Sequence, residues 1–351
     1  MSSPRILECT LRDGSYVINF QFTAHDTQQI AAGLESVGFD MIEVGHGIGL
    51  GASEQGKGVA AETDETYLKV AAETIKEADW GMFCIPGIAE LRHVDLAGKY
   101  GMDFIRIGTN IEDYEQARPF IERAKKYDMF VCANFMKSYV SAPDDFAEYA
   151  LQAEKFGADV VYIVDSAGGM LPEDIERYVD AIRARSTTIR LGFHGHNNLG
   201  LGVANALKAQ SLGIEIIDTS LQGFGRSAGN TSTEQFLCAL MQRGIDMNID
   251  PIAVMDIGEK LIHPFITARG LSSIDMVSGL ALFHSSYMPI IESYATKYRV
   301  DPRRLIVAVC EHDRADAPQD LVKEQAERLA DEGVQGAWKP LYKHYYGGEQ
   351  S

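Results

Sequence analysis

The order of apolar and amphipathic segments predicts an α/β fold, a (β/α)8 TIM barrel with a helical C-terminal extension. Eight short apolar runs follow one another between residues 5 and 245, and stretches with helical periodicity separate them. The first run leads into "TLRDGSY" and not into a glycine-rich GxGxxG turn, which favours a closed barrel over the alternative, a doubly wound open sheet. After residue 245 the helical segments follow one another without strand-like runs between them.

The predicted strands are nearly continuous apolar runs, as expected for parallel strands that are buried on both faces. In chain order they span residues 5–13, 40–47, 80–87, 103–110, 129–137, 159–166, 189–196 and 214–223. Between them, apolar residues recur at helical spacing in segments that include 23–38, 62–78, 146–157 and 171–185. We therefore expect a catalytic barrel domain over residues 1–245.

The remaining residues, 246–351, are expected to form a helical extension that packs on the barrel or on a partner. Its predicted helices span residues 250–266, 272–300, 301–312 and 319–333, and prolines mark several of the joints. The last stretch, residues 337–351, is aromatic and basic, and we interpret it as either a docking tail or a frayed terminus.

The composition is that of an acidic globular protein with a formal net charge of −18. Nucleic acids and anionic membranes bind to basic faces, so neither is an expected partner. The sequence has no apolar run long enough to span a membrane, and its N-terminus lacks a secretory signal. Its five cysteines are scattered, mostly within apolar runs, which indicates reduced thiols and a cytoplasmic location.

Polar and ionisable residues gather at the carboxyl ends of the predicted strands, where barrel enzymes carry their active sites. In chain order these residues are Arg12, Asp13, Glu43, His46, Arg106, Asn134, Lys137, Asp165, His194, His196, Arg226 and Asn230. Each residue alone has an ordinary explanation, such as helix capping by Asp165 or a surface ion pair for Arg106. A purely structural barrel does not need so many convergent ionisable groups at one end, so we predict an active site there.

Two histidines in "GFHGHNN" suit a metal ion. His194 and His196 are two positions apart at the end of one strand, so their side chains face the same way. Barrel closure brings the first strand, and with it Asp13, next to them. Two imidazoles and one carboxylate leave about three open positions for a chelating substrate and water, and they suit Mn²⁺ first, with Mg²⁺, Co²⁺, Fe²⁺ or Zn²⁺ as alternatives. Solvated loop histidines are the competing interpretation.

Four motifs carry a resemblance to a known family: "TLRDGS", "IEVGHG", "HGHNNLGLGVANA" and "GNTSTE". They resemble the DRE-TIM metallolyase superfamily, whose members include HMG-CoA lyase-like enzymes, and most closely its metal-dependent 4-hydroxy-2-oxovalerate aldolases. The resemblance covers nearly the whole chain, and the motifs occur in the family's order. It implies a divalent-metal-dependent aldolase that cleaves or forms a 4-hydroxy-2-oxo acid through a pyruvate-type enolate.

The resemblance also implies roles for individual residues. Asp13, His194 and His196 correspond to the family's metal ligands, and Asn230 to an asparagine that approaches the metal. Arg12 corresponds to the arginine that steadies the enolate oxygen, and Glu43 to a glutamate that supports the site. We expect the substrate to contact other polar side chains of the mouth and of the C-terminal helices, namely Arg106, Asn134, Lys137, Arg226 and His284.

The sequence departs from the aldolase pattern at the general base. The aldolases carry a histidine where this chain has Tyr16, so the base is either Tyr16 or His46. We favour His46, because a reference pKa near 6.5 suits proton transfer at neutral pH better than that of a phenol. The family's catalytic tyrosine on the C-terminal helices is also missing, since this stretch offers Leu280 and His284.

A second departure from the aldolase pattern is the presence of two additional basic residues. Lys137 and Arg226 stand where the aldolases have apolar or small residues, so we expect an aldehyde larger or more anionic than acetaldehyde. A Schiff base on Lys137 is the alternative role for that lysine.

Two other functions compete with the aldolase. One is a Claisen-type acyl-CoA synthase of the isopropylmalate or homocitrate synthase kind, and the other is a catalytically inactive barrel scaffold. The predicted partners are a small 2-oxo acid and an aldehyde, together with further copies of the same chain in a homo-oligomer. The aldolases often pair with a dehydrogenase, and such a partner is a further possibility here. The residues that would meet the aldehyde differ from the aldolase pattern, which weakens this expectation.

Overall fold

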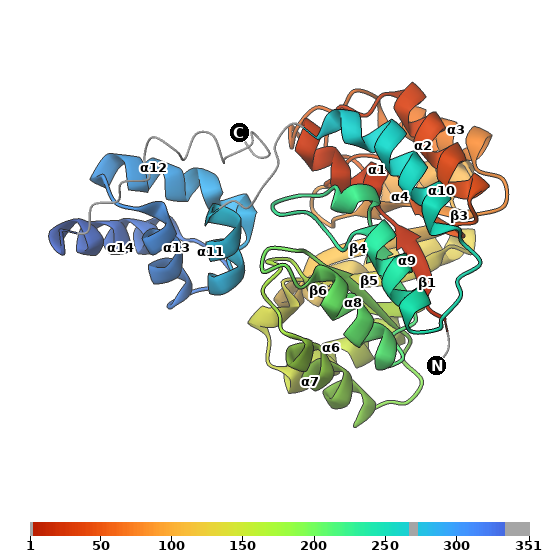
Figure 1. The fold of residues 1–351 in the computed structure, drawn as a ribbon. Helices are drawn as coiled ribbons and strands as arrows, with labels where there is room; N and C mark the ends of the chain where they lie inside the picture. The colour runs from red at the N-terminus through yellow and green to blue at the C-terminus, as the bar shows by residue number, and fades with distance from the viewer. Residues whose placement is uncertain (1–2, 267–272, 334–351) are drawn as a thin grey trace.

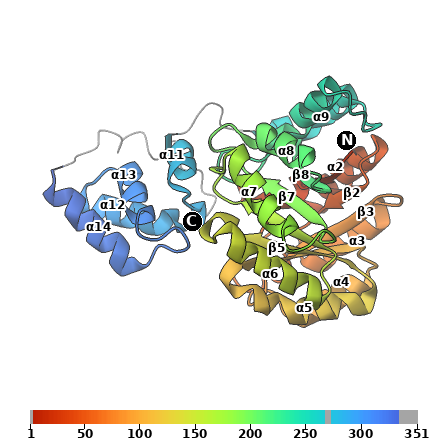
Figure 2. The same ribbon diagram turned by 90° about the horizontal axis from the view of Figure 1, so that it is seen from below.

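A closed barrel of eight parallel strands forms the centre of the molecule, which confirms the predicted fold class (Figures 1 and 2). The structure is a computed structural model that describes residues 3–266 and 273–333. The strands pair in chain order, and β1 closes the barrel against β8. They are β1 (Arg5–Glu8), β2 (Met41–Glu43), β3 (Asp79–Cys84), β4 (Phe104–Asn110), β5 (Phe130–Met136), β6 (Val160–Asp165), β7 (Leu191–Gly195) and β8 (Ile216–Thr219).

Helices cover the outside of the barrel, and all but the last of them connect consecutive strands (Figure 2). They are α2 (Ala24–Ser36), α3 (Asp64–Thr74), α4 (Leu91–Lys99), α5 (Arg118–Ala124), α6 (Pro143–Phe156), α7 (Pro172–Arg183), α8 (Gly202–Ser211) and α9 (Thr233–Gln242). Local chemistry fixes several of their ends. Thr23 and Asp26 form a capping box at the start of α2, and Gly157 ends α6 with a left-handed φ of 103°.

The first strand is shorter than predicted. It ends at Glu8, and a short helix, α1 (Thr10–Asp13), follows at once, whereas the sequence predicted a strand as far as residue 13. The carbonyl of Cys9 accepts hydrogen bonds from the backbone N–H groups of Arg12 (3.2 Å) and Asp13 (2.8 Å), which turns the chain into this helix. The turn places Arg12 and Asp13 at the carboxyl end of the barrel.

Two layers of apolar side chains hold the barrel together. Inside it, buried residues of neighbouring strands form one cluster that includes Leu7, Met41, Phe104, Tyr162 and Ile216. A larger cluster fills the space between the strands and the surrounding helices. The five cysteines, all within the described residues, are unpaired, and four of them are buried.

The C-terminal helices divide into two groups. Helix α10 (Pro251–Ile257) and the π-helical turn Gly258–Ile262 pack on the barrel, because Val254 and Ile262 belong to the barrel's apolar cluster. Helices α11 (Ser273–Ala281), α12 (Met288–Tyr298), α13 (Pro302–Cys310) and α14 (Gln319–Asp331) have an apolar cluster of their own and stand beside the barrel (Figure 1). A domain boundary at residue 245 stays a prediction, and this packing favours a boundary after residue 262. The predicted tail 337–351 lies outside the described residues.

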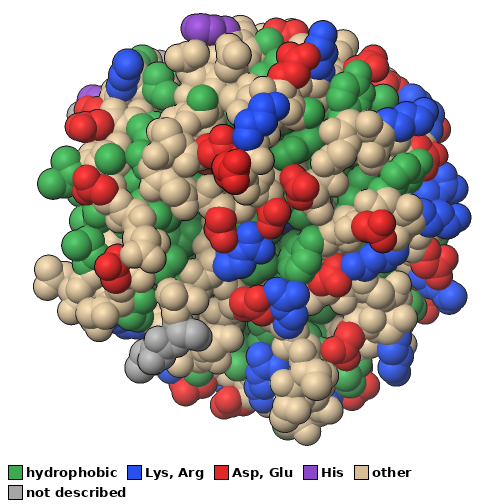
Figure 3. Space-filling model, turned by 90° about the vertical axis from the view of Figure 1, so that its right-hand side faces the viewer, with side chains coloured by type: hydrophobic (Ala, Val, Ile, Leu, Met, Phe, Trp, Pro, Cys, Tyr) green, Lys and Arg blue, Asp and Glu red, His purple; other side chains and the backbone are tan. Residues whose placement is uncertain are grey.

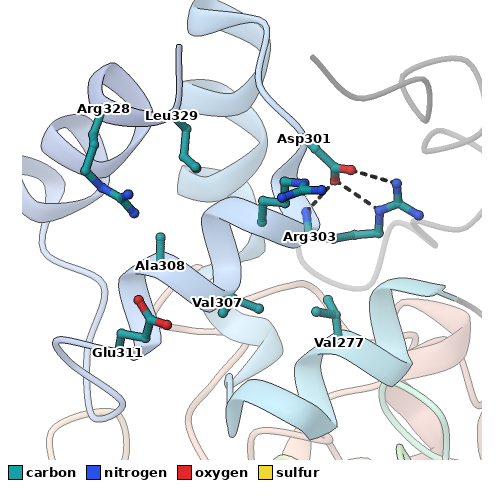
Figure 4. A pocket seen from close by; sticks show the side chains of 9 residues that line it. Val277, Asp301, Arg303, Val307, Ala308, Glu311, Arg328 and Leu329 are labelled. Carbon is teal, nitrogen blue, oxygen red and sulfur yellow. Dashed lines mark hydrogen bonds and ion pairs between the residues drawn. The ribbon is translucent and has the colours of Figure 1, made fainter. Parts of the chain in front are cut away.

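The surface shows no large field of one sign on the face drawn in Figure 3, where acidic and basic side chains alternate. None of the helices within 3–266 and 273–333 combines the length and apolar composition that crossing a membrane requires. A cavity of about 590 Å³ opens among α11, α13 and α14, where Asp301 binds Arg303 (Figure 4). It contains none of the predicted site residues.

Candidate active site

The structure brings together the three residues predicted to bind a metal. One ligand atom from each of Asp13, His194 and His196 lies within 4.8 Å of the others. The Nε2 atoms of the two histidines are 3.4 Å apart, and all three side chains are buried. The cause is local geometry: β7 presents both imidazoles on one face, and the turn after β1 delivers the carboxylate across the closing seam of the barrel.

The protonation states of this cluster suit a divalent cation. Although burial opposes it, the positive charge of Arg12, with a smaller contribution from Arg226, lowers the pKa of Asp13 well below its usual range, so the carboxyl is ionised. Burial and the charge of Arg226 lower the pKa of His196 well below 6.5, so this imidazole is neutral. An ionised carboxylate beside a neutral imidazole is the form in which both groups bind metals.

Asp218 orients one of the two imidazoles. Its Oδ2 lies 2.8 Å from Nδ1 of His194, which leaves Nε2 of that ring directed at the cluster. A carboxylate on the far nitrogen is the usual partner of a metal-binding histidine, because it fixes the tautomer and raises the basicity of the ligand. Asp218 was not among the predicted site residues, although an acidic residue inside the apolar strand "IEIIDTS" is a detectable signal.

Arg12 is held rigidly beside the cluster. Its Nε donates to Oε2 of Glu43 at 2.8 Å, and its Nη1 donates to Oδ1 of Asp13 at 2.6 Å. Nη2 makes no hydrogen bond to any described residue. The buried guanidinium therefore has one amino group free to donate to a ligand in the mouth.

Arg106 lies beneath the site and connects its two sides. Its Nη1 donates to Oε2 of Glu43 at 2.8 Å, and its Nη2 donates to Asp218 and, at 3.4 Å, to Oδ1 of Asn134. Arg106 is 0% exposed and Asn134 is 2% exposed, and the substrate contact that we expected for both stays a prediction. Arg106 belongs to a buried ion-pair network, which in order of contact is Asp13, Arg12, Glu43, Arg106, Asp218 and His194, and Asn134 lies against it through Arg106.

Asn230 lies against the cluster and binds Asp13. Its Nδ2 donates to Oδ2 of Asp13 at 2.9 Å, and its backbone forms a bridge with His196. Its Oδ1 is buried and has no hydrogen-bond partner among the described residues. The contact with Asp13 orients that carboxylate, and the approach of Asn230 to a metal stays a prediction.

His46 is packed in a way that does not suit a general base. Its ring stacks on Phe20 at a centroid distance of 4.0 Å. Its Nδ1 accepts the backbone N–H of Ile48 at 3.1 Å, and its Nε2 lies 3.3 Å from the carbonyl oxygen of Gly58. Burial lowers the pKa of His46 to about 4. With both nitrogens engaged, the ring has no free lone pair for a substrate proton, which argues against the base that we favoured from the sequence.

Tyr16 lies beside the cluster as a protonated phenol. Burial raises its pKa to about 12, although the charge of Arg226, whose guanidinium carbon is 5.9 Å from the ring centroid, acts in the opposite direction. The ring packs against Gly47, where a Cβ would come within 2.8 Å of it, so this position has no room for a side chain. At neutral pH Tyr16 is therefore a hydrogen-bond donor.

The basic residues of the mouth meet the C-terminal helices. Lys137 follows β5, and its Nζ donates to the hydroxyl of Tyr287 at 2.6 Å and to the carbonyl of Ala315 at 2.5 Å. Arg226 follows β8, and its Nη1 donates to Oγ of Ser285 at 2.5 Å. His284 precedes that serine and is half-buried. Ser285 and Tyr287 were not among the predicted site residues, because no sequence motif links them to the barrel.

Enzymes built on a parallel barrel carry their active sites at the carboxyl ends of the strands. The polar groups described above lie at that end, so the fold and the site define this class of protein. The family model described as HMGL-like matches residues 3–261. A 4-hydroxy-2-oxovalerate aldolase of Carboxydothermus hydrogenoformans is 33% identical over 93% of this chain and 97% of that protein. An oxaloacetate decarboxylase of Mycobacterium tuberculosis is 41% identical over 72% of this chain and 74% of that protein. The chain belongs to the HMGL-like family.

Solved structures share the fold. The carboxyl transferase domain of pyruvate carboxylase from Rhizobium etli matches with a TM-score of 0.75 and 15% identity, over 93% of this chain and 60% of that chain. The HMG-CoA lyase of Brucella melitensis matches with a TM-score of 0.63 and 19% identity, over 74% of this chain and 97% of that chain. With its family and its aldolase relatives, the protein is an enzyme, a carbon–carbon lyase of the aldolase type that acts on small molecules.

Proposed function

We propose that the enzyme cleaves or forms a 4-hydroxy-2-oxo acid and that Asp13, His194 and His196 hold the divalent cation that the reaction requires. The observation that carries this proposal is the cluster of three ligand atoms within 4.8 Å. Its oxygen and imidazole donors suit Mn²⁺ first, then Mg²⁺, Co²⁺ or Zn²⁺. When bound, such an ion supplies a Lewis acid for the oxo and carboxylate oxygens of the substrate.

Cleavage breaks the C3–C4 bond of the substrate. The hydroxyl on C4 loses its proton and becomes the carbonyl of an aldehyde, while the bonding electron pair passes to the C2 carbonyl and gives the enolate of pyruvate. Protonation of C3 then completes pyruvate. Arg12 is fixed by Glu43 and Asp13, and its free Nη2 is the group that we assign to the developing enolate oxygen.

We assign the proton at the C4 oxygen to Tyr16 and not to His46. In the direction of bond formation, the aldehyde oxygen becomes an alkoxide, which is a stronger base than a phenolate. A phenol with a pKa raised to about 12 can therefore protonate it as a general acid. His46 instead holds the loop after β2 through its contacts with Ile48 and Gly58.

The decisive experiment follows hydrogen exchange at C3 of pyruvate in D₂O by NMR, which requires the enolate but no aldehyde. We expect exchange that stops on chelation, returns with Mn²⁺ and needs no coenzyme A. His194→Ala should abolish it, whereas His312→Ala, which removes an exposed histidine in the turn after α13, is the matched control. Exchange that depends on acyl-CoA would support the synthase, and no exchange with any metal would support the scaffold.

Decarboxylation is a second candidate activity. Loss of CO₂ from a 3-carboxylated pyruvate gives the same enolate and requires no base for an alcohol proton, which agrees with the engaged nitrogens of His46 and the protonated Tyr16. The relative from Mycobacterium tuberculosis carries the name oxaloacetate decarboxylase. Comparison of kcat/KM for oxaloacetate and for 4-hydroxy-2-oxovalerate decides between the two activities.

A further inference from the structure

Two cations in the mouth are buried without a carboxylate of the described residues in direct contact. Lys137 and Arg226 are each only 6% exposed. Among the described residues, no carboxylate oxygen lies within 4.0 Å of either of them, whereas the neighbouring Arg12 and Arg106 are paired with acidic side chains. Buried charges in proteins are normally paired, because an unpaired one loses its hydration without compensation. Asp313 and Asp316 act on Lys137, and Asp13 acts on Arg226, only from beyond this distance, so a ligand with a negative charge would supply the direct partner that both cations lack.

One short turn brings the two cations together. Lys137 donates to Tyr287 and Arg226 donates to Ser285, and both acceptors belong to the 3-10 turn Ser285–Tyr287. These partners are neutral oxygens, so they satisfy hydrogen bonds but not the charges. Arg226 also lies against the metal-ligand cluster, since its Nη2 is 3.2 Å from Nε2 of His196. The two cations thus extend from the cluster toward the C-terminal helices.

The backbone at Lys137 supports a functional role for its side chain. Its φ of 56° and ψ of 45° lie in the left-handed region, which is unfavourable for residues other than glycine. The hydroxyl of Ser166 accepts its backbone N–H at 3.0 Å and helps to hold this conformation. Strained residues of this kind cluster at ligand sites, where the surrounding structure over-determines them.

His284 adds a donor next to these cations. The backbone N–H of Ser286 donates to its Nδ1 at 3.2 Å, so in the neutral ring the proton is on Nε2. Burial, together with the charges of Arg226 and Lys137, lowers the pKa of His284 well below 6.5. The ring is therefore neutral at pH 7 and presents an N–H group.

We propose that Lys137, Arg226 and His284 form a subsite that binds an anionic group, a carboxylate or a phosphate, on the aldehyde half of the substrate. This inference rests on the proposed aldolase function. A 2-oxo acid brings one carboxylate to the metal end, and the second negative charge would neutralise the unpaired cations. Such cations stabilise a carboxylate and so oppose its loss as CO₂. We therefore assign them to an anionic group on the aldehyde half and not to a carboxylate that leaves.

The test compares acceptor aldehydes in the direction of bond formation with pyruvate and Mn²⁺. Succinic semialdehyde carries a carboxylate, glyceraldehyde 3-phosphate carries a phosphate, and butanal has the four-carbon chain of the semialdehyde without its charge. A hydrogen bond to a charged group corresponds to about tenfold to hundredfold in binding. We therefore expect kcat/KM for at least one charged aldehyde to exceed that for butanal by about this factor, and the preferred one identifies the anion.

Variants assign the preference to the subsite. Lys137→Met should reduce the ratio of charged to neutral acceptor by about tenfold or more, and Lys137→Arg should retain most of it. The control is Lys208→Met, which removes a lysine on the outer face of α8 that is paired with Glu176 at 2.9 Å. If Lys137→Met does not fold, because Lys137 also holds Tyr287, the wild-type comparison and Lys137→Arg still decide.

The failures of the two proposals are distinguishable. Hydrogen exchange on pyruvate with equal or better use of butanal would overturn the anion subsite and leave the aldolase in place. Absence of exchange would overturn the aldolase itself. Trapping of a pyruvate adduct on Lys137 by borohydride would overturn the subsite in favour of a Schiff base.

Discussion

Replacing Asp218 by asparagine tests whether the buried network controls the proposed metal ligands. Oδ2 of Asp218 accepts from Arg106 and from Nδ1 of His194, and the residue is 1% exposed. Asparagine has nearly the same shape but no charge. If its oxygen keeps the Oδ2 position, His194 faces a neutral acceptor and becomes a weaker ligand. If the amide turns over, its NH₂ group favours the wrong tautomer, in which Nε2 of His194 carries the proton.

The expected loss is moderate because the ligand itself remains. Substitution of the group that holds a metal-binding histidine typically reduces metal affinity by about 10- to 100-fold. That range equals about 1.4 to 2.8 kcal/mol. Arg106 keeps its ion pair with Glu43, so the network loses one charge but not its anchor on β2.

Isothermal titration of chelator-treated protein with Mn²⁺ measures the effect, and circular dichroism checks the fold. Asp180→Asn, which makes the same chemical change at an exposed position of α7, is the control. A dissociation constant for Asp218→Asn within about threefold of the wild type would refute the reasoning. In that case Asp218 would be no more than a counter-ion of Arg106.

The other residues of the site give three shorter predictions. Arg12→Lys keeps the charge but loses the planar fork, so kcat should fall on the order of 10² to 10³ with little change in Mn²⁺ affinity; a normal kcat would exclude Arg12 from the mechanism. Tyr16→Phe should slow aldol formation but not pyruvate exchange, as measured side by side. His46→Gln should retain hydrogen exchange on pyruvate. Between pH 7 and pH 4 its free energy of unfolding, measured with urea, should decrease less than that of the wild type. The unfolded chain protonates His46 near pH 6.5 and the folded one near pH 4, so the wild type loses at most about 3 kcal/mol in that window.

The fold was predictable because each barrel unit repeats one local pattern. A buried parallel strand needs a continuous apolar run, a covering helix needs helical spacing, and these requirements recur around the barrel. What the sequence did not reveal was where strands end. β1 stops at Glu8 because the carbonyl of Cys9 accepts bonds from Arg12 and Asp13, and apolar Leu11 hides this turn within the pattern.

Within the site, proximity was predictable and hydrogen bonding was not. Spacing along β7 and closure against β1 placed His194, His196 and Asp13 together, and these relations follow from topology. The role of His46 depends on which atoms its ring nitrogens meet, and the backbone groups of Ile48 and Gly58 carry no signal in side-chain chemistry. Reference pKa values could not anticipate that, because burial changes them.

Charge balance divides the mouth into two parts with different requirements. Arg12 and Arg106 are matched by Glu43, Asp13 and Asp218, so the part that holds the proposed metal ligands is neutralised by the protein itself. The other part contains Lys137 and Arg226, which have no carboxylate of the described residues within ion-pair distance. It lies where the barrel meets the C-terminal helices. Enolate chemistry needs only the first part. The choice of aldehyde therefore depends on the second, and substitutions there should change which aldehyde is used before they change whether pyruvate is activated.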